Sequence, residues 1–118
     1  MLGLIILVGL QSGPLSPLTT AELTDLVSGS RLEWNPGPVS GEDYFHTGGG
    51  YLHSDRGQLP GKWWIDEGLL CFQVAYEGAE RQCLLIARDR LDRFYAARSP
   101  GEMSEGRMAE VRFVPIDE

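Results

Sequence analysis

The sequence of 118 residues has few basic side chains, only two cysteines and two histidines, and no apolar run long enough to cross a membrane. Ten Lys and Arg residues stand against seventeen Asp and Glu residues, which gives a formal net charge of −7. Binding of nucleic acid or of an anionic membrane surface needs clustered basic residues, so neither is an expected partner. Apolar residues make up 42% and charged residues 23% of the chain, which is typical of a single globular domain.

The motifs of common catalytic sites are also missing. There is no G-x-S-x-G elbow, and the run of glycines at 48–50 lacks the Lys-Ser/Thr pair and the helix that a phosphate-binding loop requires. The carboxylate pairs Glu42-Asp43 and Asp66-Glu67 lie beside glycines at expected strand ends, where a solvated turn is the usual outcome. We therefore expect a protein that is not an enzyme and carries no cofactor.

The first ten residues, MLGLIILVGL, are an apolar run followed by a polar break at Gln11. The run has the length of the apolar region of a secretory signal peptide, although it lacks a preceding basic residue and an Ala-x-Ala cleavage site. A buried first strand is the alternative, because a short apolar run does not distinguish the two. We favour a signal peptide over 1–13, a linker over 14–18 and one β-rich domain over 19–118.

Cys71 and Cys83 flank the polar turn EGAE at 77–80. A hairpin folded about residue 77 places the two cysteines directly opposite each other, at a separation close to that of a disulfide. Two reduced, buried cysteines are the alternative. Behind an export signal a disulfide is favoured, so we predict a periplasmic or secreted protein with no membrane span after signal cleavage.

One helix and a series of short strands account for the rest of the pattern. The segment TTAELTDLVSG (19–29) has an apolar face, and Thr19 and Glu22 have the spacing of a capping box. Eight stretches rich in strand formers follow, separated by short turns: SRLEWN (30–35), DYFHT (43–47), GYLHS (50–54), KWWIDE (62–67), LLCFQVAY (69–76), RQCLLIARD (81–89), RFYAAR (93–98) and RMAEVRFVP (107–115).

Short connections favour antiparallel pairing of neighbouring strands, and no second helical segment offers a parallel crossover. The sequence therefore predicts a mainly β fold, an antiparallel meander of seven or eight strands that forms a small barrel or a curled sheet, with one short N-terminal helix. The expected core consists of Leu32, Trp34, Phe45, Trp63 or Trp64, Ile65, Leu70, Phe72, Val74, Leu84, Ile86, Tyr95, Val111 and Phe113.

The two histidines, His46 and His53, lie on either side of the triple glycine. A hairpin centred between residues 49 and 50 would pair them directly, and a nearby carboxylate could complete a zinc or copper site. Ordinary surface or half-buried histidines are the alternative. Tyr44 and Tyr51, which neighbour these histidines, are candidates for contact with a ligand.

Trp63 and Trp64 occupy the most distinctive stretch, GKWWI. On a strand they point to opposite faces, so only one of them enters the core. The other covers the outer face of the sheet or contributes to a binding surface, where tryptophan is enriched.

The pattern F-x-x-G-G-x-Y at 45–51, then G-x-W at 61–63 with Cys71 eight residues after the tryptophan and Cys83 after a polar turn, resembles small secreted proteins of Gram-negative bacteria that have no established activity. The resemblance covers residues 19–95 and is carried further by Gly29. It implies a one-domain, β-rich, lipocalin-like protein and transfers no catalytic residue.

Taken together, these features predict a non-enzymatic exported binding protein whose unknown ligand is a small molecule, a glycan or another protein. A narrower alternative is an acidic inhibitor or immunity-type protein of a basic cell-envelope enzyme such as lysozyme, since the charge of −7 suits a cationic partner. The third hypothesis is a metal site at His46 and His53.

Overall fold

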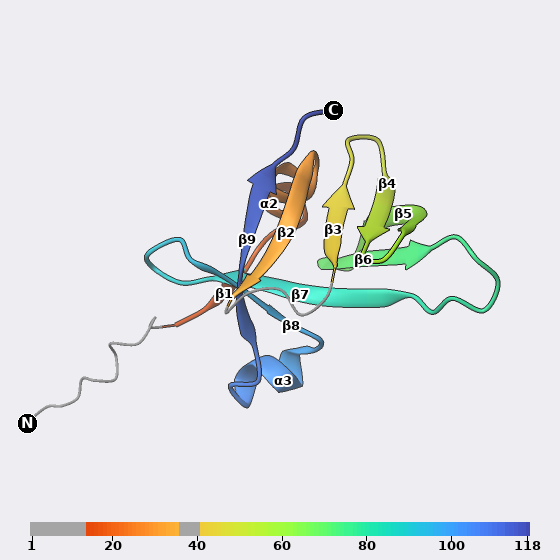
Figure 1. Cartoon of the computed structure of the whole chain (residues 1–118). Helices are drawn as coiled ribbons and strands as arrows, with labels where there is room; N and C mark the ends of the chain where they lie inside the picture. Colours follow the sequence, from red (N-terminus) through yellow and green to blue (C-terminus); the bar gives the residue numbers. More distant parts are fainter. Residues whose placement is uncertain (1–13, 36–40) are drawn as a thin grey trace, which may run out of the picture.

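A computed structural model describes residues 14–35 and 41–118 (Figure 1). The predicted signal peptide over 1–13 lies outside the described residues. Within them, eight antiparallel strands close into a barrel in which each strand pairs with the next and β9 returns to β2. The strands are β2 (Ser30–Asn35), β3 (Glu42–Phe45), β4 (Gly50–Ser54), β5 (Gln58–Asp66), β6 (Leu69–Val74), β7 (Gln82–Arg88), β8 (Phe94–Ala97) and β9 (Ala109–Pro115). The predicted β-meander is confirmed, and it closes.

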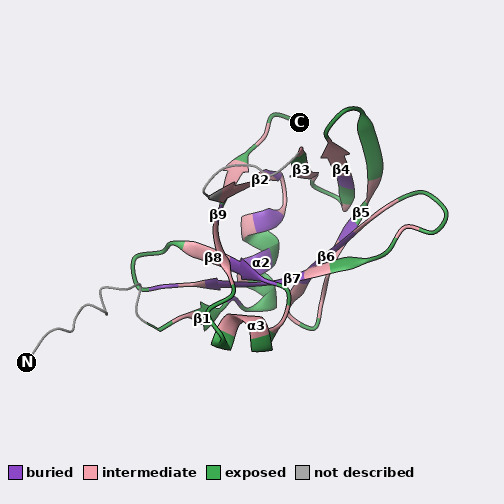
Figure 2. Cartoon of the chain, turned by 60° about the horizontal axis from the view of Figure 1, so that its bottom comes forward, coloured by how far each residue is buried: buried purple, intermediate pink, exposed green. Residues whose placement is uncertain are grey.

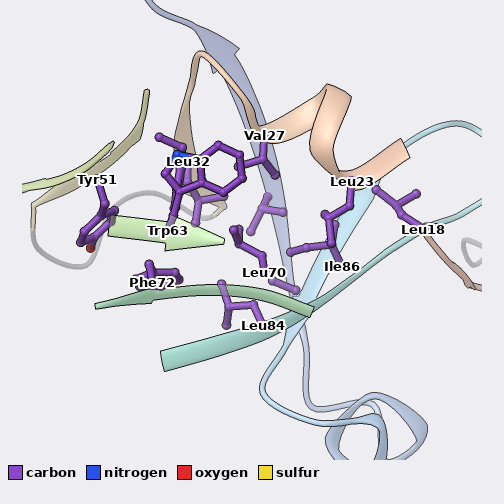
Figure 3. Close-up of a cluster of buried hydrophobic side chains, with 13 residues drawn as sticks. Leu18, Leu23, Val27, Leu32, Tyr51, Trp63, Leu70, Phe72, Leu84 and Ile86 are labelled. Atoms are coloured by element: carbon purple, nitrogen blue, oxygen red, sulfur yellow. The ribbon is translucent and has the colours of Figure 1, made fainter. Parts of the chain in front are cut away.

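Apolar residues that alternate along the strands fill the barrel. Side chains from the helix and from strands far apart in the sequence point toward one another in a single cluster (Figure 3). The expected core residues belong to this cluster or pack against it, except Tyr95. Tyr95 is adjacent to the buried Ala96 and so faces outward, where its hydroxyl donates a hydrogen bond to Asp89 (3.1 Å).

Helix α2 (Thr20–Val27) packs its apolar face onto the barrel. The capping box is present: the Thr19 hydroxyl accepts from the backbone N–H of Glu22, whose carboxylate accepts from the backbone N–H of Thr19. Leu23 and Val27 are fully buried, and the buried part of α2 faces inward in Figure 2. The helix therefore contributes directly to the core.

Two short elements lie outside the predicted pattern. In the segment 14–18, β1 (Ser16–Pro17) pairs with the end of β7, and Leu18 is buried in the core. Helix α3 (Pro100–Ser104) occupies the stretch interpreted as a turn after β8. Its N-terminal signals are in the sequence: the Ser99 side chain accepts from the backbone N–H of Glu102, and proline occupies the first helical position.

The β3–β4 hairpin has a register different from the one that would pair the histidines. Asp43 lies opposite His53, and the backbone N–H of His46 bonds to the Gly50 carbonyl (2.8 Å). Gly48 and Gly49 both have positive φ, which lets the turn centre on residue 48. A direct His46–His53 pair is therefore wrong.

The two ends of the barrel differ in what surrounds them. The helix end contains α2, the turns at 46–49, 67–68 and 89–93, and the segment 116–118. The loop end contains the turns at 55–57 and 75–81 and the corner at 98–108 that includes α3. Among the described residues, no helix has the length and apolar character needed to span a membrane.

Candidate functional site

A hollow of about 690 Å³ lies at the loop end, under the β6–β7 hairpin. Its apolar part comes from Val74 and Leu84, and the exposed Tyr76 lies on its hairpin side. Pockets that bind small ligands typically have volumes of about 300–1,000 Å³, so the hollow has room for one. The remaining lining residues are Gly78, Glu80, Arg81, Gln82, Cys83 and Arg98.

Arg98 has a side chain with no hydrogen bond or ion pair within the described structure, although it lines the hollow. Only its backbone N–H is used, and it donates to the Glu102 carboxylate (3.0 Å). Arg81 lies 3.6 Å from Asp66, beyond hydrogen-bond distance. With Glu80 as the one carboxylate among the lining residues, the hollow is locally basic in a chain of net charge −7.

A second polar group lies on the inner face of β3 and β4. The Asp43 carboxylate accepts a hydrogen bond from the Tyr51 hydroxyl (2.5 Å) and lies 2.9 Å from Nδ1 of His53. Because a carboxylate only accepts, the second contact places a proton on Nδ1. Gly41 approaches the ring closely, since a Cβ atom at that position would lie 3.0 Å from Nε2 of His53.

Tyr51 is the central residue of this group. Burial, together with the hydrogen bond to Asp43, raises the pKa of its hydroxyl well above the ordinary value, so that it remains a donor. Its ring packs against Phe45 and Phe72, with centroids 5.4 and 5.0 Å away. In residues 14–35 and 41–118 no serine, threonine or cysteine side chain bonds to His53.

Trp63 and Trp64 point to opposite faces, as predicted. Trp63 is buried in the core, and its indole N–H donates to the carbonyl of His46 (2.8 Å). Trp64 lies on the outer face, half-buried, with the Lys62 ammonium 5.7 Å from its ring centroid. It lies opposite Cys71 in the β5–β6 register. The sequence leaves open whether Trp64 covers the sheet or binds a partner. Its position beside the fully buried Cys71 favours the first role, in which the Trp64 ring covers the outer face of the sheet.

The predicted disulfide is confirmed. Cys71 and Cys83 lie opposite each other on β6 and β7, with Cα atoms 4.0 Å apart, and are bonded. They flank the 75–81 loop, which supplies part of the hollow. The disulfide therefore fixes the base of the hairpin that carries the site.

Tyr44 lies in a network of charged groups on the outer face. Its hydroxyl donates to Glu42 (2.5 Å), and this hydrogen bond, together with burial, raises the pKa of Tyr44. Arg31 bonds to Glu33 (2.7 Å), and hydrogen bonds from Arg112 and Arg31 lower the pKa of Glu33. The polar groups around Tyr44 are thus already paired within the fold.

His46 contacts the end of the chain rather than His53. Its Nδ1 lies 3.2 Å from the Glu118 carboxylate, which also accepts from the hydroxyl (2.6 Å) and the backbone N–H (2.8 Å) of Thr47. The hydrogen bond from the Thr47 hydroxyl has the larger effect and the one from its backbone N–H the next, and both lower the pKa of Glu118. Among the described residues no three His, Cys, Asp or Glu side chains come together as metal ligands.

Sequence reasoning did not identify the residues that form the hollow. Tyr76, Gln82 and Arg98 form no motif, and they meet because β7, which follows the 75–81 loop, pairs with β8, which ends just before Arg98. Only the disulfide prediction pointed to this hairpin.

No family model, curated protein or solved structure matches this chain. The resemblance to small secreted β-rich proteins stays a prediction.

Proposed function

We propose that this chain is an exported, non-enzymatic binding protein that holds a small ligand in the loop-end hollow. The observation that carries the proposal is a hollow of about 690 Å³ whose lining includes polar side chains, among them Gln82 and Arg98, that have no partner among residues 14–35 and 41–118. The barrel interior is the less suitable place, because the packed rings of Phe45, Tyr51 and Trp63 already occupy it.

A further observation supports part of this proposal. The Cys71–Cys83 disulfide supports export, because the cytosol keeps thiols reduced whereas the periplasm and the extracellular space do not.

Binding to a cationic protein is the second candidate. At the helix end, Asp25, Asp92 and Asp117 are exposed and form no ion pair within the described part of the chain. An inhibitor of a basic envelope enzyme such as lysozyme would use such a surface, and its affinity would fall steeply with salt.

Thermal unfolding with a library of small metabolites tests the first candidate. A ligand at 100 times its Kd adds about 2.7 kcal/mol to the free energy of unfolding, which is a measurable rise in Tm. We expect at least one compound to stabilise the chain, and Gln82→Trp, which fills the hollow, to abolish the effect.

Arg90→Trp is the matched control, because Arg90 is exposed in the β7–β8 turn at the opposite end of the barrel. If no compound stabilises the chain, or if both variants respond equally, the hollow is not the binding site. In parallel, titration with lysozyme at low and high salt tests the second candidate. Tight binding that disappears at high salt would favour the second candidate function over the first.

A further inference from the structure

We infer that the ligand of the loop-end hollow is an organic anion whose carboxylate or phosphate group is bound by the side chain of Arg98, assisted by Arg81. This inference rests on the proposed function and adds the chemical class of the ligand.

Arg98 is the residue on which the inference depends. A guanidinium group has five N–H donors in a planar fork, which matches the oxygens of a carboxylate or a phosphate. The nearby carboxylate of Glu102 accepts a hydrogen bond from the backbone N–H of Arg98 (3.0 Å) and forms no ion pair with the Arg98 guanidinium within the described residues. The donors of the Arg98 side chain are therefore available to a ligand.

The position of Arg98 is held by the fold. It directly follows Ala97, which is buried and paired with Leu85 of β7. It directly precedes Ser99, which caps α3. Because both neighbours are fixed, the Arg98 backbone lies at a defined place on the edge of the hollow.

Other polar groups of the hollow complement the arginine. Arg81 approaches Asp66 only to 3.6 Å, and its side chain is 56% exposed, so it can turn toward an anion at small cost. The side chains of Tyr76 and Gln82 make no hydrogen bond in the described structure, and each offers a further donor.

The apolar side chains of the hollow indicate the chemical character of the rest of the ligand. Val74 and Leu84 contribute apolar side chains to its lining, and the ring of Tyr76 can cover an apolar group. A bare inorganic anion would leave this surface uncovered. The lining thus favours an anion with a compact apolar body over inorganic phosphate.

Three probes of nearly the same shape separate charge from shape: phenylacetate, phenyl phosphate and the neutral phenylacetamide. Each is titrated into the ¹⁵N-labelled, disulfide-bonded chain at low ionic strength, and the backbone amide shifts of Gly78, Gln82 and Arg98 are followed. We expect at least one of the two anions to shift these amides with an affinity at least tenfold above that of phenylacetamide. The stronger of the two identifies whether a carboxylate or a phosphate is preferred.

Arg98→Gln should lower the affinity for the preferred anion at least tenfold, whereas Arg90→Gln, at the helix end, should leave it unchanged. Both positions are exposed, so both variants should fold, and their thermal unfolding confirms it. Equal binding of phenylacetate and phenylacetamide, or equal affinity of the two variants, overturns the inference.

An absence of shifts with both anions on the order of 10 mM also overturns it, because a millimolar Kd would already fill the site. These outcomes remain distinct from failure of the proposed function. If a library compound stabilises the chain and Gln82→Trp abolishes that effect, the proposed binding function stands even where the anion probes fail.

Discussion

A polar cluster around Glu118 at the helix end and the polar side chains of the loop-end hollow differ in how they use their hydrogen-bonding groups. At the helix end the Glu118 carboxylate takes three contacts, from His46 and from the side chain and backbone of Thr47. At the loop end the side chains of Gln82 and Arg98 make none within the described residues. The Glu118 cluster is thus occupied by contacts within the chain, whereas the lining of the hollow has donors left for a second molecule.

Exposure to water explains why the loop-end groups can remain without partners. Polar groups that are removed from water must be bonded, and among the described residues no buried side-chain polar atom lacks a partner. Gln82 and Arg98 are exposed, so water satisfies them until a ligand replaces it. The fold can therefore keep them unpaired at little cost in stability, and stability and binding can reside at different ends.

The largest expected effect comes from Trp63, whose ring lies in the core and meets Phe45 edge to face, with centroids 6.1 Å apart. Trp63→Ala should lower the free energy of unfolding by about 3–5 kcal/mol, because it leaves a cavity. Urea unfolding measures the loss. Trp63→Phe, which keeps most of the packing, provides a second variant if the alanine variant does not fold.

Trp64→Ala is the matched control for that change, since Trp64 lies on the outer face of the same strand. Its expected cost is about 1 kcal/mol, as for most substitutions outside a core. Equal losses at the two positions would contradict the assignment of Trp63 to the interior.

Removal of the disulfide should have the next largest effect and should act unequally on the two ends. The bond closes a loop of sequence separation 12, and the variant with both Cys71→Ala and Cys83→Ala should lose about 2–3 kcal/mol. Because the bond joins β6 to β7, amide hydrogen exchange should accelerate there more than in β2 and β9. Uniform acceleration along the chain would show that the disulfide is not a local clamp of the hollow.

Features set by neighbours in the sequence were predictable. The alternation of apolar residues gave the eight strands of the barrel, and the hairpin about residue 77 placed Cys71 opposite Cys83. The opposite orientations of Trp63 and Trp64 follow from strand geometry alone. The capping box of α2 was visible for the same reason.

Features set by a single φ angle or by distant contacts were not predictable. The two positive φ values at Gly48 and Gly49 shift the β3–β4 hairpin, and this brings His53 beside Asp43 instead of His46. The hollow depends on the β6–β7 hairpin and Arg98 coming together at one end of the barrel. Its lining residues come from separate strands and loops, so no local sequence pattern predicts them.

The Glu118 contacts should make the helix end sensitive to acid. Hydrogen bonds from Thr47 lower the pKa of Glu118 below the ordinary 4.5, so its stabilising effect is present above that pH and is lost as pH falls through the lower folded pKa. Glu118→Gln should therefore flatten the fall in Tm between roughly pH 5 and 3. Glu80→Gln, at the loop end, should leave the curve unchanged, because the Glu80 carboxylate makes no hydrogen bond to any described residue. Identical curves for the two variants would contradict this assignment.

The smallest expected effect lies at the loop end itself. Arg98→Gln and Gln82→Ser should each change the free energy of unfolding by less than about 0.5 kcal/mol, because both side chains are exposed and unbonded. Ser30→Ala is the counterpart at the helix end, where the buried hydroxyl donates to the Val27 carbonyl (2.7 Å), and it should cost about 1 kcal/mol. Chemical denaturation of the three variants without ligand measures both. A large loss from Arg98→Gln would assign that arginine to the fold, and its donors would no longer be free for an anion.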